Sequence, residues 1–372
     1  MRIVIAPDSF KGTASAVEAA TSIAEGWLEV RPHDDLTLIP MADGGEGTLG
    51  VLAAAVAGAQ TRTVRGCTGP DGRPVDGRFV LLPDGTGAVE LATTSGLPLL
   101  RRLNPLRAHT RGVGEVIAAA LDAGAHRLAI AVGGSASTDG GTGALRALGL
   151  ELYDSHDQPL ADGGGALAAL ARIDRDGLRP PPAGGVEILS DVRNPLLGPN
   201  GAAARFGPQK GATPDDVAIL DGGLARLAQL SDGDPAAPGT GAAGGTAFGF
   251  ATFWQARITS GAAVIGDHVG LDRALRDADL IITGEGLLDD TSRDGKVVGH
   301  VAARARANGT PVVVICGSAV TTAWAPIVGV LALTSLAGTQ GDARGQVQHW
   351  LRAAGAQAAR NADEYGAIRR PR

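Results

Sequence analysis

What this chain lacks disfavours several common classes of protein. Cys67 and Cys316 are the only cysteines in 372 residues, so neither a zinc cluster nor a disulfide scaffold is expected. The seven histidines show no HxH or HExxH spacing, which also argues against a zinc site. The formal net charge of −6 argues against nucleic-acid binding, because proteins with that role normally carry a basic stripe.

Long apolar segments are also missing. The N-terminal residues reach Pro7 and Asp8 too early for a signal peptide. Residues 318–341 carry no charge, but Trp324, Pro326 and several Thr and Gly residues make them a poor membrane span, and a buried strand and helix are expected there. We therefore expect a cytoplasmic protein with no membrane partner.

Familiar catalytic motifs are absent as well. No GxxxxGK[ST] sequence occurs, so the chain is not a P-loop enzyme, and the protein-kinase motif set is missing. Ser135 and Ser137 lie outside any GxSxG context, so a hydrolase nucleophile elbow is not supported. Any phosphate chemistry must therefore use other loops.

Glycine, by contrast, is abundant, with 56 residues placed mainly in short loops between apolar runs. Runs rich in β-branched residues predict buried parallel strands at residues 2–6, 36–40, 128–132, 186–189, 280–283 and 312–316. Amphipathic patterns predict helices at residues 15–30 and 111–123. This alternation predicts an α/β fold.

The chain is long enough for two domains. Turn signals within residues 61–82 predict an antiparallel pair in the middle of the chain, unlike the two ends. We expect residues 1–60 and 256–372 to form one discontinuous α/β domain, with residues 61–255 inserted as a second. Ligand would then bind between the domains, outside the carboxyl ends of the parallel strands.

The sequence MADGGEGT, residues 41–48, joins a predicted strand to a helical pattern. Its glycines permit close backbone approach, and a following helix N-terminus offers amide groups to an anion. Asp43 and Glu46 would repel a bare phosphate, so a divalent cation between them makes better sense. The segment therefore indicates metal and phosphate chemistry.

Similar polar, glycine-containing loops follow other predicted strands, and they carry acids and cations. One such loop is as often a simple turn, but five at strand ends are harder to explain in that way. Convergent carboxylates need cations, and Mg²⁺ bound to phosphate is the usual partner. The loop acids are Asp8, Asp43, Glu46, Asp139, Asp191 and Glu285, and the cations that would face a phosphoryl group are Lys11, Arg193, Lys210 and Lys296.

A dinucleotide site remains as an alternative. Gly45, Gly47 and Gly50 match GxGxxG between a strand and a helix, and Asp71 follows about 20 residues later. Asp43 and Glu46 are badly suited to a pyrophosphate without metal. An NAD-dependent oxidoreductase acting on small hydroxy acids is therefore the second interpretation.

Together these segments resemble the bacterial type of glycerate kinase. The resemblance covers most of residues 1–300 in order, and several of its motifs are long and specific. It implies a flavodoxin-like doubly wound parallel sheet plus a smaller α/β domain with a mixed sheet, and ATP- and Mg²⁺-dependent phosphorylation of D-glycerate. The matching stretches are APDSFKGT (6–13), PMADGGEGT (40–48), VGGSASTDGG (132–141), SDVRNPLLGPNGAA (190–203), FGPQKGA (206–212), ITGEG (282–286) and DGK (294–296).

The resemblance also suggests roles for individual residues. Asp191 is the predicted base, either Arg193 or a cluster of loop N–H groups would bind the glycerate carboxylate, and Asn194 lies beside them as a catalytic group. Asp8, Asp43 and Glu46 would hold Mg²⁺, directly or through water, and Lys11 would neutralise charge on the transferred group together with Lys210. The expected nucleotide-binding residues are Gly133, Gly134, Ser135, Lys210, Gly284, Glu285, Gly286 and Lys296.

The chain departs from the family pattern after its GEG sequence. Family members usually continue with Arg-Leu-Asp and then a glutamine two positions on, whereas this chain has Leu287 and Thr291 at the corresponding places. A non-catalytic sensor of small acids is therefore a third interpretation. The sequence leaves open whether the 2- or 3-hydroxyl is phosphorylated, which acids bind the metal directly, and whether the chain forms a homo-oligomer.

Overall fold

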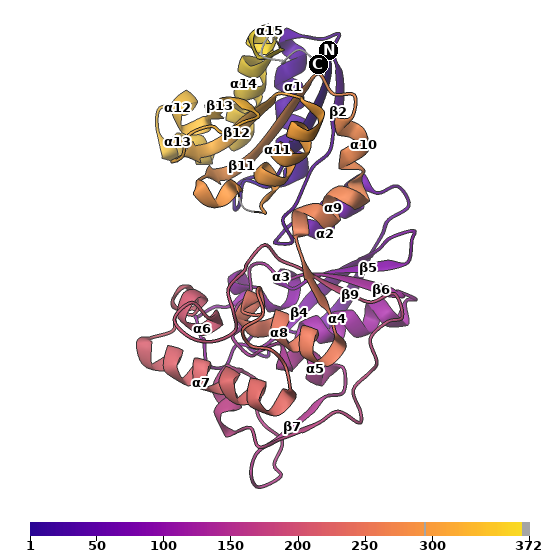
Figure 1. Cartoon of the computed structure of the whole chain (residues 1–372), viewed down its shortest axis with the longest axis vertical. Helices are drawn as coiled ribbons and strands as arrows, with labels where there is room; N and C mark the ends of the chain where they lie inside the picture. The colour runs from indigo at the N-terminus through magenta and orange to yellow at the C-terminus, as the bar shows by residue number, and fades with distance from the viewer. Residues whose placement is uncertain (294, 367–372) are drawn as a thin grey trace. The chain divides into compact units, whose positions relative to one another are not determined.

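The computed structural model describes residues 1–293 and 295–366, which form two compact units. Within these residues, unit 1 consists of Met1–Asp43, Gly50–Val56 and the part of the chain from Ser260 onward, and unit 2 consists of Gly44–Leu49 and Ala57–Thr259. Figure 1 shows that unit 1 combines the indigo start of the chain with its orange and yellow end. Residue 294, part of the DGK motif, lies outside the described residues. The sequence-based domain limits, 1–60 with 256–372 and 61–255, stay a prediction.

In the described part of unit 1, five parallel strands form one sheet in the order β2-β1-β11-β12-β13. Numbered within the unit this is 2-1-3-4-5, the flavodoxin-like order, with the reversal of direction next to β1. The prediction of a flavodoxin-like parallel sheet is confirmed. The strands are β1 (Arg2–Pro7), β2 (Asp35–Leu38), β11 (Leu280–Leu288), β12 (Val312–Ala319) and β13 (Ile327–Ala332).

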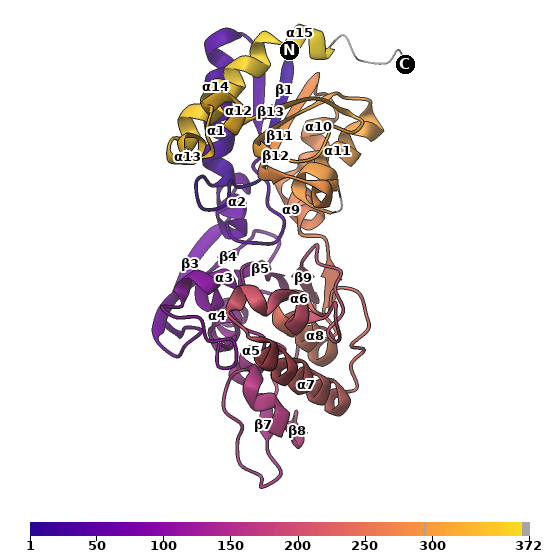
Figure 2. The same cartoon turned by 90° about the vertical axis from the view of Figure 1, so that its left-hand side faces the viewer.

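Helices cover both faces of this sheet (Figure 2). On one face α1 (Ala16–Val30) packs against α14 (Val347–Arg360), although their sequences lie more than 300 residues apart. The two helices approach so closely at Gly26 that a side chain would not fit there. A Cβ on Gly26 would lie 1.8 Å from the carbonyl oxygen of Arg352. The other helical segments of unit 1 are α2 (Thr48–Ala55, whose first two residues belong to unit 2), α9 (Gly261–Val269), α10 (Leu271–Leu275), η4 (Asp290–Arg293), α11 (Val297–Asn308), α12 (Leu333–Ala337), α13 (Gln340–Gly345) and α15 (Ala362–Gly366).

Unit 2 contains a mixed sheet in the order β10-β9-β6-β5-β4-β3 within its described residues. The first four strands are parallel, and the predicted antiparallel pair in residues 61–82 is confirmed as β3 and β4. The mixed-sheet part was expected to be the smaller of the two, but Ala57–Thr259 alone is longer than all segments of unit 1 together. The strands are β3 (Gln60–Thr68), β4 (Pro74–Leu81), β5 (Thr86–Glu90), β6 (Arg127–Ala131), β9 (Val186–Leu189) and β10 (Arg257–Thr259).

The helices of unit 2 pack on this sheet and on one another. Helix α4 contacts β3, β4 and β5, and α8 contacts β9 and β10. A separate antiparallel pair joins β7 (Glu151–Tyr153) to β8 (Arg172–Asp174). The helical segments are α3 (Ala92–Ser95), η1 (Leu97–Leu99), α4 (Arg111–Asp122), α5 (Thr142–Ala147), η2 (Gly164–Ala169), α6 (Ala202–Phe206), η3 (Pro208–Lys210), α7 (Pro214–Ser231) and α8 (Ala242–Trp254).

The helix predicted at residues 15–30 is confirmed as α1, and its start shows a local reason for this boundary. Ser15 begins α1 with a capping box: its Oγ accepts from the amide of Glu18 (3.2 Å), and a Glu18 carboxylate oxygen accepts from the amide of Ser15 (2.9 Å). The uncharged segment 318–341 contains a strand and a helix, β13 and α12, but the expected burial is found only at Ile327 and Leu333, while the rest of both elements is partly buried or exposed. Among the described residues, none of the helices combines the length and apolar character that crossing a membrane requires.

Strand β11 corrects one prediction. Residues 284–286 were expected to form a loop after a short strand, but β11 continues to Leu288 because β12 pairs with it along that length. The close pairing requires glycine, since a Cβ on Gly284 would lie 2.1 Å from the carbonyl oxygen of Ile315. Glu285 therefore projects from a central strand, which fixes its backbone more firmly than a loop would.

Replacing Gly284 by alanine tests this packing. We expect Gly284→Ala to reduce the free energy of unfolding by about 1–3 kcal/mol. The new methyl group would clash with the backbone of Ile315, which is held in place by the pairing of β12 with β11. Gly50→Ala is the control, since Gly50 lies in a helix with open space around the added Cβ. Urea unfolding followed by circular dichroism measures both. Equal stability of Gly284→Ala and wild type would contradict the packing.

Candidate functional site

A cavity of about 300 Å³ lies at the carboxyl ends of the parallel strands of unit 1. Residues after β1 and residues of β11 both line it, which places it at the position where the strand order reverses. Such a position is the usual ligand site of open α/β sheets. The polar residues that line the cavity include Asp8, Lys11, Asp43, Glu285, Asp289, Lys296, Gln340 and Arg344.

The acids of the cavity are close enough to affect one another. Asp8 is 6% exposed, and its burial, reinforced by the charge of Asp43, raises its pKa to about 7. Burial also raises the pKa of Glu285, against the opposing effects of Ser292 and Lys296. Oε1 of Glu285 is buried and has no hydrogen-bond partner in the described part of the chain. Burial therefore disfavours the charged forms of Asp8 and Glu285.

Two lysines lie beside these acids. The Nζ of Lys11 is 3.6 Å from a carboxylate oxygen of Asp43, which is the main reason that the pKa of Lys11 is raised. The Nζ of Lys296 lies 4.0 Å from Glu285 and 3.8 Å from Asp289. A hydrogen bond from Thr291 lowers the pKa of Asp289. The site thus alternates acidic and basic groups around one cavity.

This donor set fits a hydrated divalent cation. Asp8 and Asp43 face the cavity together, and the buried oxygen of Glu285 supplies a further unsatisfied acceptor. No cluster of three metal-binding side chains occurs among the described residues. Mg²⁺ commonly takes only one or two carboxylates and completes its shell with water and substrate phosphate. Glu46, the third predicted metal ligand, belongs to unit 2.

In unit 2 the loop after β6 packs on the MADGGEGT segment. The amide of Gly133 donates to the carbonyl of Gly44 (3.1 Å). A Cβ on Gly133 would lie 2.5 Å from the Cα of Gly45, so only glycine allows this approach. Gly134 and Ser135 follow in the same loop. The structure therefore brings two of the predicted loops together within unit 2.

Glu90 is a residue that the sequence analysis missed. It ends β5, is 5% exposed, and accepts hydrogen bonds from the amides of Gly47 and Leu49, each 3.2 Å long. Burial raises the pKa of Glu90, while these two amides oppose the rise. The signal that could have found it is an acid directly after the short apolar pair Ala88 and Val89. The carboxylate of Glu90 thus accepts hydrogen bonds from backbone amides at the start of α2.

Lys210 is buried within unit 2 and is 1% exposed. Its Nζ donates to Oγ of Ser135 (2.9 Å) and to the carbonyl of Ser137. Burial lowers the pKa of Lys210 to about 7, although the charge of Asp139 acts in the opposite direction. In this structure the lysine therefore positions the loop of residues 133–138, and it does not line the cavity of unit 1.

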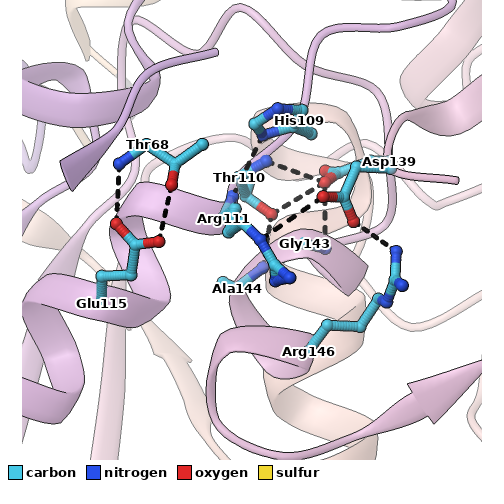
Figure 3. Close-up of polar contacts among 10 residues, drawn as sticks. Thr68, His109, Thr110, Arg111, Glu115, Asp139, Gly143, Ala144 and Arg146 are labelled. Carbon is cyan, nitrogen blue, oxygen red and sulfur yellow. Dashed lines mark hydrogen bonds and ion pairs between the residues drawn. The ribbon is translucent and has the colours of Figure 1, made fainter. Parts of the chain in front are cut away.

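Asp139 is likewise occupied by hydrogen bonds (Figure 3). One of its oxygens accepts from the amide and the hydroxyl of Thr110, at 2.9 and 2.8 Å, and from the amide of Gly143 at 3.2 Å. The other accepts from the amide of Gly141 at 3.2 Å. The hydroxyl of Thr110 in turn accepts from the amide of Ala144 (2.9 Å). Asp139 therefore joins its loop to the starts of α4 and α5.

Asp191, Arg193 and Asn194 follow β9, the neighbour of β6 in the mixed sheet. Asp191 and Asn194 are half-buried and Arg193 is exposed. The side-chain amide of Asn194 donates to the carbonyl of Asn200 (2.8 Å). Because β6 and β9 are parallel neighbours, these residues and Gly133–Ser135 belong to loops at the same edge of the sheet. The predicted site residues thus form two groups, one in each unit.

Comparison with known proteins gives a consistent result. The family model described as "Glycerate kinase family" matches residues 3–363. Glycerate kinase of Bacillus subtilis (strain 168) is 44% identical over 327 residues, which cover 86% of this chain and 85% of the relative. Glycerate 2-kinase of Escherichia coli (strain K12) is 40% identical over 327 residues, with coverage of 86% and 85%. The crystal structure of a putative glycerate kinase 2 from Salmonella typhimurium LT2 has a TM-score of 0.82 and 36% identity, covering 99% of this chain and 100% of that one.

The burial of Lys210 predicts a pH-dependent stability. Burial lowers the pKa of Lys210 to about 7 in the folded protein, whereas the lysine of the unfolded chain keeps its ordinary pKa of 10.5. Between these values the unfolded state binds more protons at this residue, so the contribution of Lys210 to the free energy of unfolding rises with pH, by up to about 1.4 kcal/mol per pH unit. Lys210→Met should lack this contribution. Urea unfolding of both proteins from pH 6.5 to 9.5 measures the difference.

The control is Lys296→Met, which removes a half-exposed lysine of unit 1 and retains Lys210. Its stability should rise with pH as the wild type does. A constant difference between wild type and Lys210→Met across the range would show that Lys210 is not buried as described.

Proposed function

The chain belongs to the glycerate kinase family and is a kinase, and from this premise we propose that it transfers a phosphoryl group from ATP to a hydroxyl of D-glycerate, giving phosphoglycerate and ADP. The observation that most supports this reaction is the cavity of unit 1, where buried carboxylates and lysines surround one space at the strand ends. Phosphoryl transfer depends mainly on positioning and on neutralising charge, and this set of side chains suits both.

Asp8 and Asp43 are the proposed ligands of Mg²⁺ in this cavity, directly or through water. Their mutual repulsion and the buried oxygen of Glu285 favour a bound cation. When bound, the ion would neutralise negative charge on the phosphate oxygens. Glu46 remains a third proposed ligand from the sequence pattern.

The lysines of the cavity are the proposed phosphate-binding groups. Lys11 and Lys296 each lie next to a carboxylate, so a cation bound by the acids would free their ammonium groups to donate to phosphate oxygens. Gly284, Glu285 and Gly286 are proposed to line the nucleotide. This part of β11 is paired with β12, and that pairing restrains its backbone.

The proposed acceptor residues lie in unit 2. Asp191 would accept the proton of the attacking hydroxyl, Arg193 would bind the carboxylate of glycerate, and Asn194 would assist them. Gly133, Gly134 and Ser135 stay proposed nucleotide contacts, with Lys210 supporting their loop through its contacts to Ser135 and Ser137. A location of catalysis between two domains and a cytoplasmic setting stay predictions.

The dinucleotide alternative is weakened by Glu90. In a dinucleotide fold, the amides at the helix start face the pyrophosphate. Here the amides of Gly47 and Leu49 already donate to the carboxylate of Glu90, which would itself repel a pyrophosphate. An NAD-dependent oxidoreductase is therefore the less favoured function.

An ADP-release assay tests the proposed function. We expect ADP formation from ATP with D-glycerate and Mg²⁺, and loss of that activity when EDTA removes the metal. A panel of small hydroxy acids defines the acceptor, and analysis of the product identifies the phosphorylated hydroxyl. Glycerate binding without ADP release would instead support a non-catalytic sensor, and NAD binding without Mg²⁺ would support the oxidoreductase.

Asp191→Asn tests the proposed base. We expect kcat to fall by about 10²–10⁴, because the amide cannot accept the hydroxyl proton. Asp174→Asn, on the short strand β8 of the same unit, is the control and should keep wild-type turnover. Circular dichroism establishes that both variants are folded. If Asp191→Asn retained full turnover, another group would have to orient the acceptor.

A further inference from the structure

The cavity of unit 1 is lined by one cation that none of the proposed roles includes. Arg344 lies on α13, the short helix that contacts both β12 and α14. Thr339 caps the start of this helix: its Oγ1 accepts from the amide of Asp342 (3.1 Å) and donates to the Asp342 carboxylate (2.7 Å). Ala343 is buried, while the neighbouring Arg344 is exposed along the cavity. The helix is therefore anchored by its cap and its buried alanine.

Arg344 differs from the two lysines in its partners. Lys11 lies within 4 Å of Asp43, and Lys296 lies within 4 Å of Glu285 and Asp289. Arg344 makes no ion pair or hydrogen bond with any residue in the ranges that the structure describes. Its guanidinium stays charged at every physiological pH. A permanent positive charge without a protein partner is thus available to an anion in the cavity.

Neighbouring side chains support binding of an oxyanion there. Gln340, one turn before Arg344 on α13, also lines the cavity and offers a neutral amide donor. Leu287, which stands where the family usually has arginine, lines the same cavity without charge. The guanidinium in this cavity is therefore that of Arg344 on α13, whereas the end of β11 contributes the uncharged Leu287.

The chemistry of the cavity favours a phosphate chain over a lone carboxylate. Four carboxylates line it, on Asp8, Asp43, Glu285 and Asp289, so a small anion by itself would meet repulsion. A chain of phosphates has oxygens enough to contact a metal ion at the acids and a guanidinium at the same time. Arginine matches phosphate well, because its planar donors bind two oxygens at once.

We propose that Arg344, assisted by Gln340, forms an oxyanion subsite that binds the polyphosphate of the phosphoryl donor. This inference rests on the proposed function, which names that donor as ATP. It adds a substrate-binding residue from a part of the chain in which no site residue was predicted. It would also give the cavity a guanidinium for phosphate although Leu287 carries no charge.

Calorimetric titration with Mg²⁺-tripolyphosphate tests the subsite without turnover. We expect wild type to bind this probe and Arg344→Gln to bind it roughly 10–100-fold more weakly, since a charged hydrogen-bonding partner is lost. Arg344→Lys should lie between them, because it keeps the charge but loses the paired donors. Arg360→Gln is the control: it removes an equal charge from α14 outside the cavity and should leave affinity unchanged.

Kinetics of the same variants separate the two substrates. Arg344→Gln should raise KM for ATP while KM for D-glycerate stays at the wild-type value. The proposal is overturned if wild type does not bind Mg²⁺-tripolyphosphate, if Arg344→Gln binds it as tightly as wild type does, or if only KM for glycerate rises. Circular dichroism of each variant establishes folding, and Arg344→Lys provides a second, more conservative comparison.

Failure of the proposed function would look different. In that case wild type would release no ADP with any acid of the panel, yet the difference in tripolyphosphate affinity between wild type and Arg344→Gln would persist. That result would retain the oxyanion subsite and reject the kinase reaction on glycerate.

Discussion

The parallel pairing of β1 with β11 is the contact on which the cavity of unit 1 depends. It joins residues almost 280 positions apart, from Ile3 opposite Leu280 to Pro7 opposite Gly284. The amide of Asp8 extends this ladder by donating to the carbonyl of Gly284 (2.8 Å). This pairing places Asp8, which follows β1, beside Glu285 on β11. Without it, these two carboxylates would not lie in the same cavity.

Bringing buried carboxylates together has a chemical consequence. Burial disfavours the charged forms of Asp8 and Glu285 and raises the pKa of both. Lys11 and Lys296 offset part of this charge, and a divalent cation would offset more. A site of this kind is suited to a ligand that brings metal and phosphate together, which is the property that phosphoryl transfer uses.

Unit 2 uses similar residue types for a different purpose. Glu90 and Asp139 accept hydrogen bonds mainly from backbone amides, and Lys210 donates to the loop after β6. These contacts fix the glycine-rich loops, whose backbones have little intrinsic preference for one conformation. Charged residues in the strand-end loops therefore divide into some that face a cavity and others that hold the loops in shape.

Local sequence patterns were sufficient for much of the fold. The strands near residues 2–6 and 186–189, the helix at 15–30 and the antiparallel pair within 61–82 all appear where their periodicity and turn residues place them. Such features depend on neighbours within a few residues, so the order of the amino acids alone determined them. Several residues that the glycine and acid motifs pointed to line the cavity of unit 1, namely Asp8, Lys11, Asp43, Glu285 and Lys296.

Other features depend on contacts that a local pattern does not contain. The extension of β11 through Glu285 follows from its pairing with β12, and β2 is a mostly exposed edge strand because only β1 pairs with it. The same holds for side chains: nothing in the sequence distinguishes buried Lys210 from Lys11 at the cavity. The sequence by itself determined which loops carry charge, whereas only the tertiary structure decided which charges share a cavity, because burial and pairing arise between segments distant in the chain.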